Sequence, residues 1–175
     1  MDEAIGRFEA LLVDLQRILG VDHPDTLTTR GNLASWLARA GRVDEAIGRL
    51  EALLVDRQRI LGPDHPHTLA TRGNLASFLA RVGRVDEAIA LFEALLVDRQ
   101  RILGPEHPHT LAMRFNLAMC LGEAGRVDKA IGQFEALLKD CLRVLGPEHP
   151  LTKNVREALE RLKREDGSDS SPKQP

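Results

Sequence analysis

The 175-residue chain is poor in aromatic residues and in cysteine. It contains no tyrosine, one tryptophan and five phenylalanines, so aromatic residues make up only 3% of it. A β-sandwich needs more aromatic and β-branched residues, and this shortage therefore disfavours an all-β fold. The two cysteines, Cys120 and Cys141, are too few for a disulfide framework, and neither has a cysteine or histidine at metal-ligand spacing. We expect reduced thiols, no bound metal and no cofactor.

The chain also lacks an excess of positive charge and any long apolar run. Its formal net charge is −2 at pH 7, which leaves no whole-protein basic surface for nucleic acid. No apolar run reaches the length of about 18 residues that a membrane-spanning helix needs, and the acidic start Met1-Asp2-Glu3 is unlike a signal peptide. These absences predict a cytoplasmic protein that binds neither nucleic acid nor membrane.

What the sequence does contain is a repeat of 42 residues. The segment Gly-Arg-Val-Asp-Glu-Ala begins at Gly41 and returns at Gly83, and a variant with lysine in place of glutamate begins at Gly125. A Leu-Gly pair and a His-Pro pair each occur four times at the same step. Periodicity of this length indicates a solenoid of stacked units. We expect full repeats over 24–65, 66–107 and 108–149.

Each repeat predicts two helices. Leu27, Leu33 and Leu37 form the apolar stripe of a first helix over about 25–40, with a proline at its start and a glycine just beyond its end. The second helix begins at the acidic pair Asp44-Glu45, and Gly62-Pro63 ends it. The whole pattern predicts an all-α fold of about eight helices. It comprises a lone helix over 2–19, the paired helices of the repeats, a capping helix over 151–164 and a disordered tail over 165–175.

The two ends of the array differ. The last helix carries charge where an earlier repeat has Leu69, Ala76 and Leu79, and this polar face is typical of a solenoid cap. Its charged residues are Lys153, Glu160 and Lys163. The first helix is more apolar than its copies, since Leu15 replaces an arginine. Two explanations remain open: the chain is cut from a longer array, or two chains bury this helix in a homodimer through Phe8, Leu12 and Leu15.

The segment from Asn74-Leu75-Ala76 through Leu79 to Phe92 resembles the tetratricopeptide repeat (TPR). The junction Leu-Gly-Pro-Asp-His-Pro-x-Thr-Leu is similar to that of the kinesin-light-chain-like subclass, which occurs in bacterial regulators. The resemblance covers residues 2–164 and implies a right-handed α-solenoid of antiparallel helix pairs that binds proteins. The chain departs from the subclass at Gly31, Gly73 and Phe115, where asparagine is common.

In this family the first helix of each pair lines a concave groove. Matching asparagines contact ligand backbone in the family, and an amide carries both a donor and an acceptor, as a peptide unit does. The alternative is that the asparagines bind neighbouring side chains or water. Arginines on the same face favour acidic or phosphorylated partners. The candidate peptide-binding residues are Asn32, Asn74, Asn116, Ser35, Ser77, Arg39, Arg81, Phe115 and Met119.

The remaining residues suggest packing rather than chemistry. The His-Pro histidines recur one repeat apart, too far for shared metal ligation, and we interpret them as turn residues ahead of a helix-starting proline. Trp36 and Phe78 are expected to pack between units rather than to form an aromatic cage. Cys120 is expected in the core, and Cys141, which stands at an arginine position of the repeat, is expected to be more exposed. No catalytic constellation is present, so we predict a non-enzymatic protein-binding scaffold, with a self-association module as the alternative.

Overall fold

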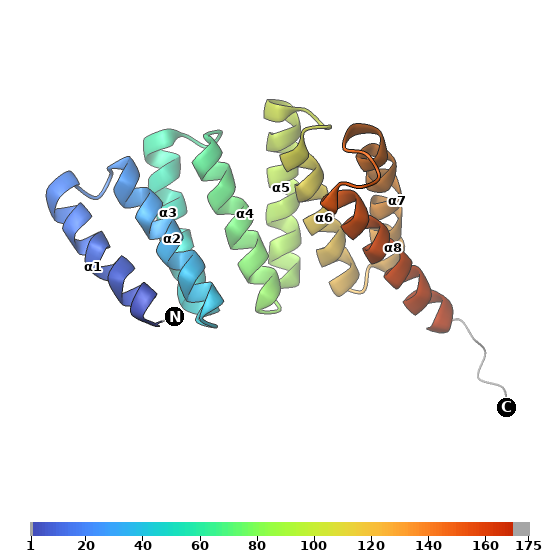
Figure 1. Ribbon diagram of the computed structural model, residues 1–175, viewed down its shortest axis with the longest axis horizontal. Helices are drawn as coiled ribbons and strands as arrows, with labels where there is room; N and C mark the ends of the chain where they lie inside the picture. The colour runs from blue at the N-terminus through green and yellow to red at the C-terminus, as the bar shows by residue number, and fades with distance from the viewer. Residues whose placement is uncertain (1, 170–175) are drawn as a thin grey trace. The chain divides into compact units, whose positions relative to one another are not determined.

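The computed structural model describes residues 2–169, and side chains over residues 2–166. Over this range the chain is all-α, with no strand, as predicted (Figure 1). The eight helices of the described range are α1 (Asp2–Leu19), α2 (Pro24–Arg39), α3 (Val43–Leu61), α4 (Pro66–Arg81), α5 (Val85–Leu103), α6 (Pro108–Glu123), α7 (Val127–Val144) and α8 (Pro150–Asp169). None of these helices is long and apolar enough to cross a bilayer.

The chain divides into two compact units, Met1–Leu91 and Phe92–Pro175, with the division inside α5. In the first unit α2 packs against α1 and α3, and α3 packs against α4. In the second unit α6 packs against α7, and α7 packs against α8. Sequential helices are therefore neighbours within each unit, as expected when short turns connect antiparallel helices.

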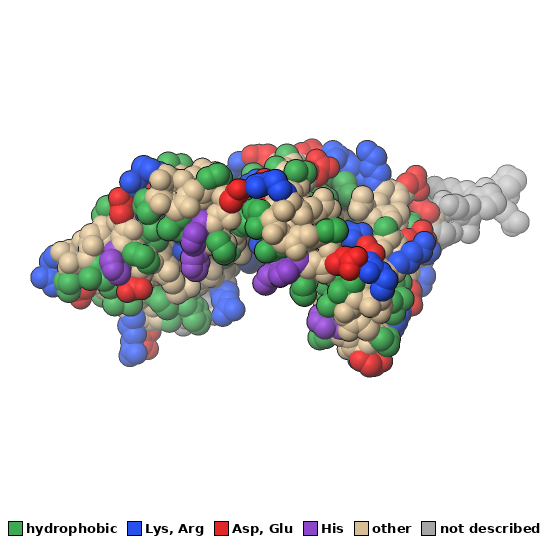
Figure 2. Space-filling model, turned by 90° about the horizontal axis from the view of Figure 1, so that it is seen from above, with side chains coloured by type: hydrophobic (Ala, Val, Ile, Leu, Met, Phe, Trp, Pro, Cys, Tyr) green, Lys and Arg blue, Asp and Glu red, His purple; other side chains and the backbone are tan. Residues whose placement is uncertain are grey.

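The His-Pro pairs start the first helix of each repeat. His23 has an extended backbone, and its Nδ1 atom accepts the backbone N–H of Asp25 at 3.2 Å. His65 and His107 accept the N–H two residues later in the same way, each at 3.2 Å. The bond satisfies one of the free donors of the first helical turn, while proline has no donor to lose. Histidine side chains reach the molecular surface (Figure 2), as expected of turn residues.

A buried threonine lies at each of these junctions. Thr26, Thr68, Thr110 and Thr152 are all inaccessible to solvent. Thr26 donates its hydroxyl to the carbonyl of Gly20 at 2.8 Å, and Thr152 makes the same bond to Gly146. These bonds attach the end of one helix to the start of the next. The threonine recurs in the sequence, but its role was not predicted.

Glycine ends the first helix of each repeat. Gly41 has a φ of +85°, a conformation that residues with a Cβ rarely adopt. The N–H of Arg42 then bonds the carbonyl of Leu37 at 3.0 Å, and the N–H of Gly41 bonds that of Ala38 at 3.3 Å. This pattern satisfies the last carbonyl groups of α2.

Both cysteines lie in the core. The prediction for Cys120 is confirmed, since it is buried, and burial raises the pKa of its thiol to about 11. The prediction for Cys141 is wrong, because this residue is 0% exposed and its thiol pKa is also raised by burial. Cys141 stands at a position that faces neighbouring helices. The arginines seen there in other repeats suggested a solvent position instead.

The last helix differs from its predicted extent. α8 continues to Asp169, past residue 164 where the change in composition predicted its end. Polar composition does not itself stop a helix. Of the disordered tail predicted over 165–175, residues 165–169 belong to α8, and residues 170–175 lie outside the described residues. Lys153, Glu160 and Lys163 are all exposed, as a polar outer face requires.

Candidate functional site

The two asparagines of the first unit lie on exposed surface. Asn32 on α2 and Asn74 on α4 are both exposed. Neither side chain hydrogen-bonds another described residue. The alternative that these amides bind neighbouring side chains therefore finds no support among the described residues. Both amides are left to solvent or to a ligand.

Asn32 lines a small surface pocket with three other residues. Ser35, Trp36 and Arg39 complete this pocket, which measures about 190 Å³. Three of the four residues were predicted to bind peptide, and the structure brings them together. The fourth, Trp36, was expected to serve packing alone. Its ring does lie near Phe8, with centroids 6.3 Å apart, but it also lines the pocket.

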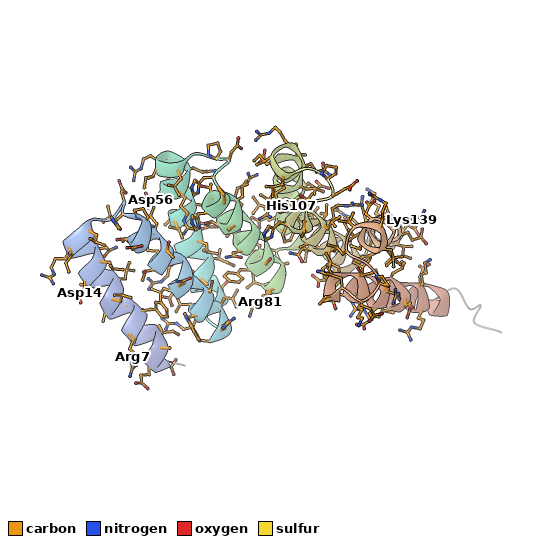
Figure 3. All side chains as sticks on the ribbon, turned by 45° about the horizontal axis from the view of Figure 1, so that its top comes forward. Arg7, Asp14, Asp56, Arg81, His107 and Lys139 are labelled. Carbon is orange, nitrogen blue, oxygen red and sulfur yellow. The ribbon has the colours of Figure 1, made fainter. Side chains whose placement is uncertain are left out.

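Arginine and an aromatic ring form a pair at the C-terminal end of α2 and of α4. The guanidinium of Arg39 lies 5.3 Å from the centre of the Trp36 ring. Arg81, labelled in Figure 3, lies 5.7 Å from the centre of the Phe78 ring and donates a hydrogen bond to the carbonyl of Ala38 at 3.1 Å. Such cation–π contacts orient an exposed guanidinium at a contribution of about 0.5–1 kcal/mol. Both arginines are exposed.

The candidate serines are engaged within their own helices. Ser35 donates its hydroxyl to the carbonyl of Gly31 at 3.1 Å, and Ser77 donates to that of Gly73 at 3.0 Å. Each oxygen can still accept a bond from a ligand. The serines therefore offer acceptors rather than free donors.

The candidates of the second unit are more deeply placed. Asn116 is half-buried, and the ring of Phe115 packs edge-on against Phe134 of α7, with centroids 5.7 Å apart. Met119 lines a cleft of about 230 Å³ whose opposite wall includes Arg161 of α8. Phe115 therefore contributes to packing within its unit, and Met119 lines the cleft.

The predicted self-association residues are partly covered by α2. Leu12 is only 9% exposed, while Phe8 and Leu15 are half-buried. Leu11 is instead 46% exposed, although Leu53, its equivalent one repeat later, is 0% exposed. The apolar surface left open on α1 therefore includes Leu11 and excludes Leu12.

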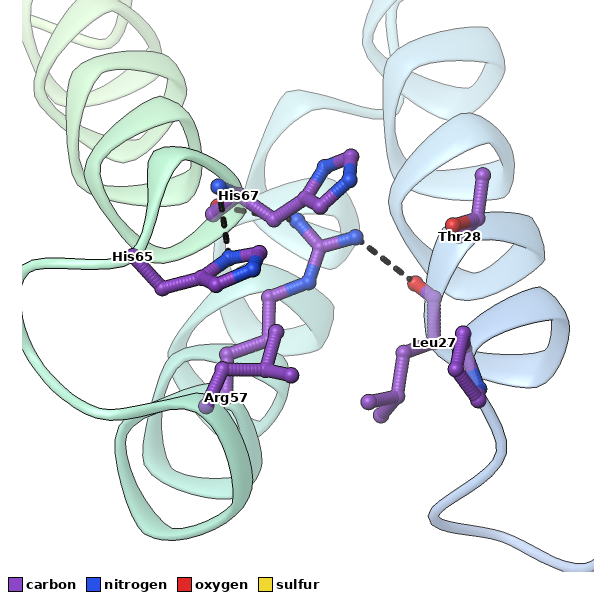
Figure 4. A pocket seen from close by; sticks show the side chains of 7 residues that line it. Leu27, Thr28, Arg57, His65 and His67 are labelled. Carbon is purple, nitrogen blue, oxygen red and sulfur yellow. Dashed lines mark hydrogen bonds between the residues drawn. The ribbon is translucent and has the colours of Figure 1, made fainter.

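Sequence analysis missed a buried arginine in the first unit. Arg57 on α3 is 6% exposed, and its Nη1 atom donates to the carbonyl of His67 at 3.1 Å and to the hydroxyl of Thr71 at 2.7 Å. Its Nη2 atom donates to the carbonyl of Leu27 at 3.1 Å (Figure 4). Arg57 thus links α3 to both α2 and α4. One sequence feature could have indicated that this repeat position is buried. Successive repeats hold Leu15, Arg57, Arg99 and Cys141 there, and leucine and cysteine are typical of buried positions.

The described residues hold no group of three or more histidines, cysteines and carboxylates that could bind a metal ion. His65 and His67 stack on each other, with ring centroids 5.3 Å apart. His65 already uses Nδ1 to cap α4. These histidines therefore shape a helix start.

Comparison with known proteins identifies the family. Two family models, both described as tetratricopeptide repeat, match residues 26–67 and 68–139. The chain belongs to the tetratricopeptide repeat family. A search of curated proteins gives no match.

Solved structures agree with this assignment. A Podospora anserina protein of nearly identical TPR-like repeats, named as a kinesin light chain, matches with a TM-score of 0.81 and 28% identity, over 95% of this chain and 79% of that one. BtubC (BKLC) from P. vanneervenii matches with a TM-score of 0.75 and 19% identity, over 94% and 66%. The translocator chaperone SycD of Yersinia enterocolitica matches with a TM-score of 0.61 and 19% identity, over 83% and 88%. The predicted kinesin-light-chain-like TPR fold is confirmed.

Proposed function

We propose that this TPR protein is a non-enzymatic scaffold in the bacterial cytoplasm that binds an extended segment of a partner protein along the exposed faces of α2 and α4. The observation that carries the proposal is the pair of exposed amides, Asn32 and Asn74, which have no hydrogen-bond partner among the described residues. An amide can donate to a ligand carbonyl and accept from a ligand N–H at once. Two such groups on successive first helices bind backbone without selecting side chains.

The pocket beside Asn32 supplies selectivity. Trp36 gives it an apolar wall, and Arg39 lies over the indole ring at 5.3 Å. A partner side chain that enters this pocket meets an aromatic surface and a cation together. Arg81 repeats the cation one helix pair later. This arrangement supports a preference for acidic or phosphorylated segments, because charge-assisted bonds to arginine are stronger than neutral ones.

The second unit carries its own candidate contacts, Asn116, Phe115 and Met119. These residues are half-buried. They lack the basic character of the first unit, since the Met119 cleft also contains Glu123 and Glu165 beside Arg161. We propose that this unit contacts a less acidic part of a partner through the apolar side chain of Met119.

Replacing both exposed asparagines tests the proposal. Peptides selected from an array by the wild-type protein should bind the double variant Asn32→Ala/Asn74→Ala at least about tenfold more weakly, because two hydrogen-bonding amides are lost. Fluorescence anisotropy measures the affinities. Gln58→Ala removes an exposed amide from α3 and serves as the matched control, with affinity within about twofold of wild type. Unchanged affinity in the double variant would contradict the proposal.

Self-association through α1 is the second candidate, favoured by the 46% exposure of Leu11. In this second candidate, two chains cover the apolar face of α1 in a homodimer, with Leu15 at the edge of the covered surface. The mass measured by sedimentation should then rise with concentration, and Leu15→Arg should keep the protein monomeric. Asp14→Arg changes an exposed neighbour and is the control. A wild-type protein that stays monomeric at high concentration would exclude this candidate.

A further inference from the structure

A second cleft of the first unit surrounds the buried arginine. It measures about 210 Å³ and lies between the start of α2, the end of α3 and the start of α4. Figure 4 shows the guanidinium of Arg57 between the imidazoles of His65 and His67 on one side and Leu27 and Thr28 on the other. No carboxylate lines this cleft.

The positive charge of Arg57 has no anionic partner among the described residues. Its three hydrogen bonds go to two backbone carbonyls and one hydroxyl, and its Nε atom is buried without a partner. Burial, the largest effect, lowers the pKa of Arg57, but a guanidinium remains protonated in proteins. A buried cation without a counter-ion is unfavourable, and an anion placed beside it relieves this cost.

The acidic residue that precedes Arg57 in the sequence, Asp56, is already paired with other arginines. Asp56 pairs with Arg30 at 2.7 Å and with Arg59 at 3.3 Å. The hydrogen bond from Arg30 holds the pKa of Asp56 below its usual range, so this carboxylate is ionised and paired. Arg30 in turn repels the charge of Arg57. The chain therefore supplies the cleft with a cation and leaves the anion to come from outside.

Four further features of the cleft suit an oxyanion. His65 accepts a hydrogen bond at Nδ1, so its neutral ring carries the proton on Nε2 and can donate from there. The hydroxyl of Thr28, an exposed residue, is another donor. The amino-terminal end of α4, which begins at Pro66, adds the positive end of a helix dipole. A free N–H of Arg57 Nη2 completes the set, because only one bond from this atom is made.

We infer that this cleft binds one oxyanion, a carboxylate or phosphate group, through Arg57, His65 and Thr28. The group can belong to a free anion or to an acidic residue of a bound segment. A free anion reaches the cleft from solvent. Thr28 lies one helical turn before Asn32 on α2, so an acidic residue of a segment bound at Asn32 also reaches it. The inference does not depend on the asparagine contacts, since a free anion tests it without any peptide.

The experiment titrates the folded chain with inorganic phosphate at constant ionic strength and follows backbone and arginine side-chain N–H signals by NMR. We expect saturable shifts at Arg57 Nε–H and at the Thr28 and His67 amides, with a dissociation constant of about 1 mM. A parallel arm uses the peptides acetyl-Gly-Glu-Gly-amide and acetyl-Gly-Gln-Gly-amide. Saturation by phosphate supports a free anion, whereas saturation only by the glutamate peptide supports an acidic residue as the source.

Variants decide whether the shifts come from this cleft. Arg57→Met removes the charge, and Thr28→Glu places a competing carboxylate on an exposed position of the rim; each should weaken binding at least about tenfold. Thr28→Gln is the uncharged counterpart of Thr28→Glu; it also loses the Thr28 hydroxyl but adds no competing charge, so it should bind the probes more tightly than Thr28→Glu does. If Arg57→Met fails to fold, the Thr28 pair still gives the answer. Absence of saturable shifts with every probe, or equal binding by Thr28→Glu and Thr28→Gln, would overturn the inference.

Discussion

Leu53→Ala is expected to lower the free energy of unfolding by about 2–5 kcal/mol, whereas Leu11→Ala is expected to lower it by less than about 1 kcal/mol. The two leucines occupy the same place in successive repeats, but Leu53 is 0% exposed and Leu11 is 46% exposed. Removing a fully enclosed side chain loses its burial and leaves a cavity, while a half-exposed side chain leaves little cavity. Urea denaturation followed by circular dichroism measures both values.

The pair is its own control, because both changes put alanine into the interior of a helix and so alter helix propensity equally. Equal costs at the two sites would show that something covers Leu11 in solution. Repeating the measurement at several protein concentrations then identifies a second chain as that cover. A cost at Leu11 that grows with concentration would support self-association, and a small, constant cost would support an open helix face.

Local signals explain why the helices could be predicted from the sequence. A histidine that caps its own helix, the proline after it, and a glycine with φ of +85° such as Gly41 act within a few residues. The exposed positions of Asn32 and Asn74 followed from helical spacing in the same way. None of these features depends on which helix packs nearby.

Burial at particular positions could not be predicted, because it depends on the neighbouring helices. Leu11 and Leu53 have the same residue type and repeat position, yet a helix covers only one of them. Cys141 and Arg57 share a position that was interpreted as solvent-facing because arginine occurs there. The arginine is instead buried among backbone carbonyls of two other helices. Sequence pattern alone does not contain that contact.

The buried arginine also explains why a small residue stands at position 31 inside α2. A Cβ atom on Gly31 would lie 3.5 Å from Leu53 Cδ2 and 3.6 Å from Arg57 Nη2, so larger side chains would displace the guanidinium. The sequence repeats this pairing at Gly73 and Arg99 and changes both members at Phe115 and Cys141, always 26 residues apart. In the second unit the Phe115 ring packs against Phe134 at 5.7 Å. We therefore expect that the space filled by the Arg57 side chain between α2 and α3 is filled between α6 and α7 by the Phe115 ring.

Exchanging the pair within the first unit should therefore show strong coupling. Gly31→Phe alone is expected to cost about 1–3 kcal/mol through overpacking, and Arg57→Cys alone about 1–3 kcal/mol because carbonyls of α2 and α4 lose their donor. The double variant Gly31→Phe/Arg57→Cys reproduces the Phe115 and Cys141 combination. It should be more stable than the sum of the single costs predicts by at least about 1 kcal/mol. Urea denaturation of the four proteins gives the coupling energy.

Gly48 provides the control for this cycle, because it is exposed on α3 and a Cβ there would meet nothing within 4 Å. Gly48→Phe should cost less than about 1 kcal/mol and should be additive with Arg57→Cys to within about 0.5 kcal/mol. Gly31→Ala should be neutral or stabilising by up to about 1 kcal/mol, since its Cβ makes only ordinary contacts and alanine favours a helix. Additive costs for Gly31→Phe and Arg57→Cys would mean that the two side chains do not compete for one space. The glycines at 31 and 73 would then be explained by duplication of the repeat alone.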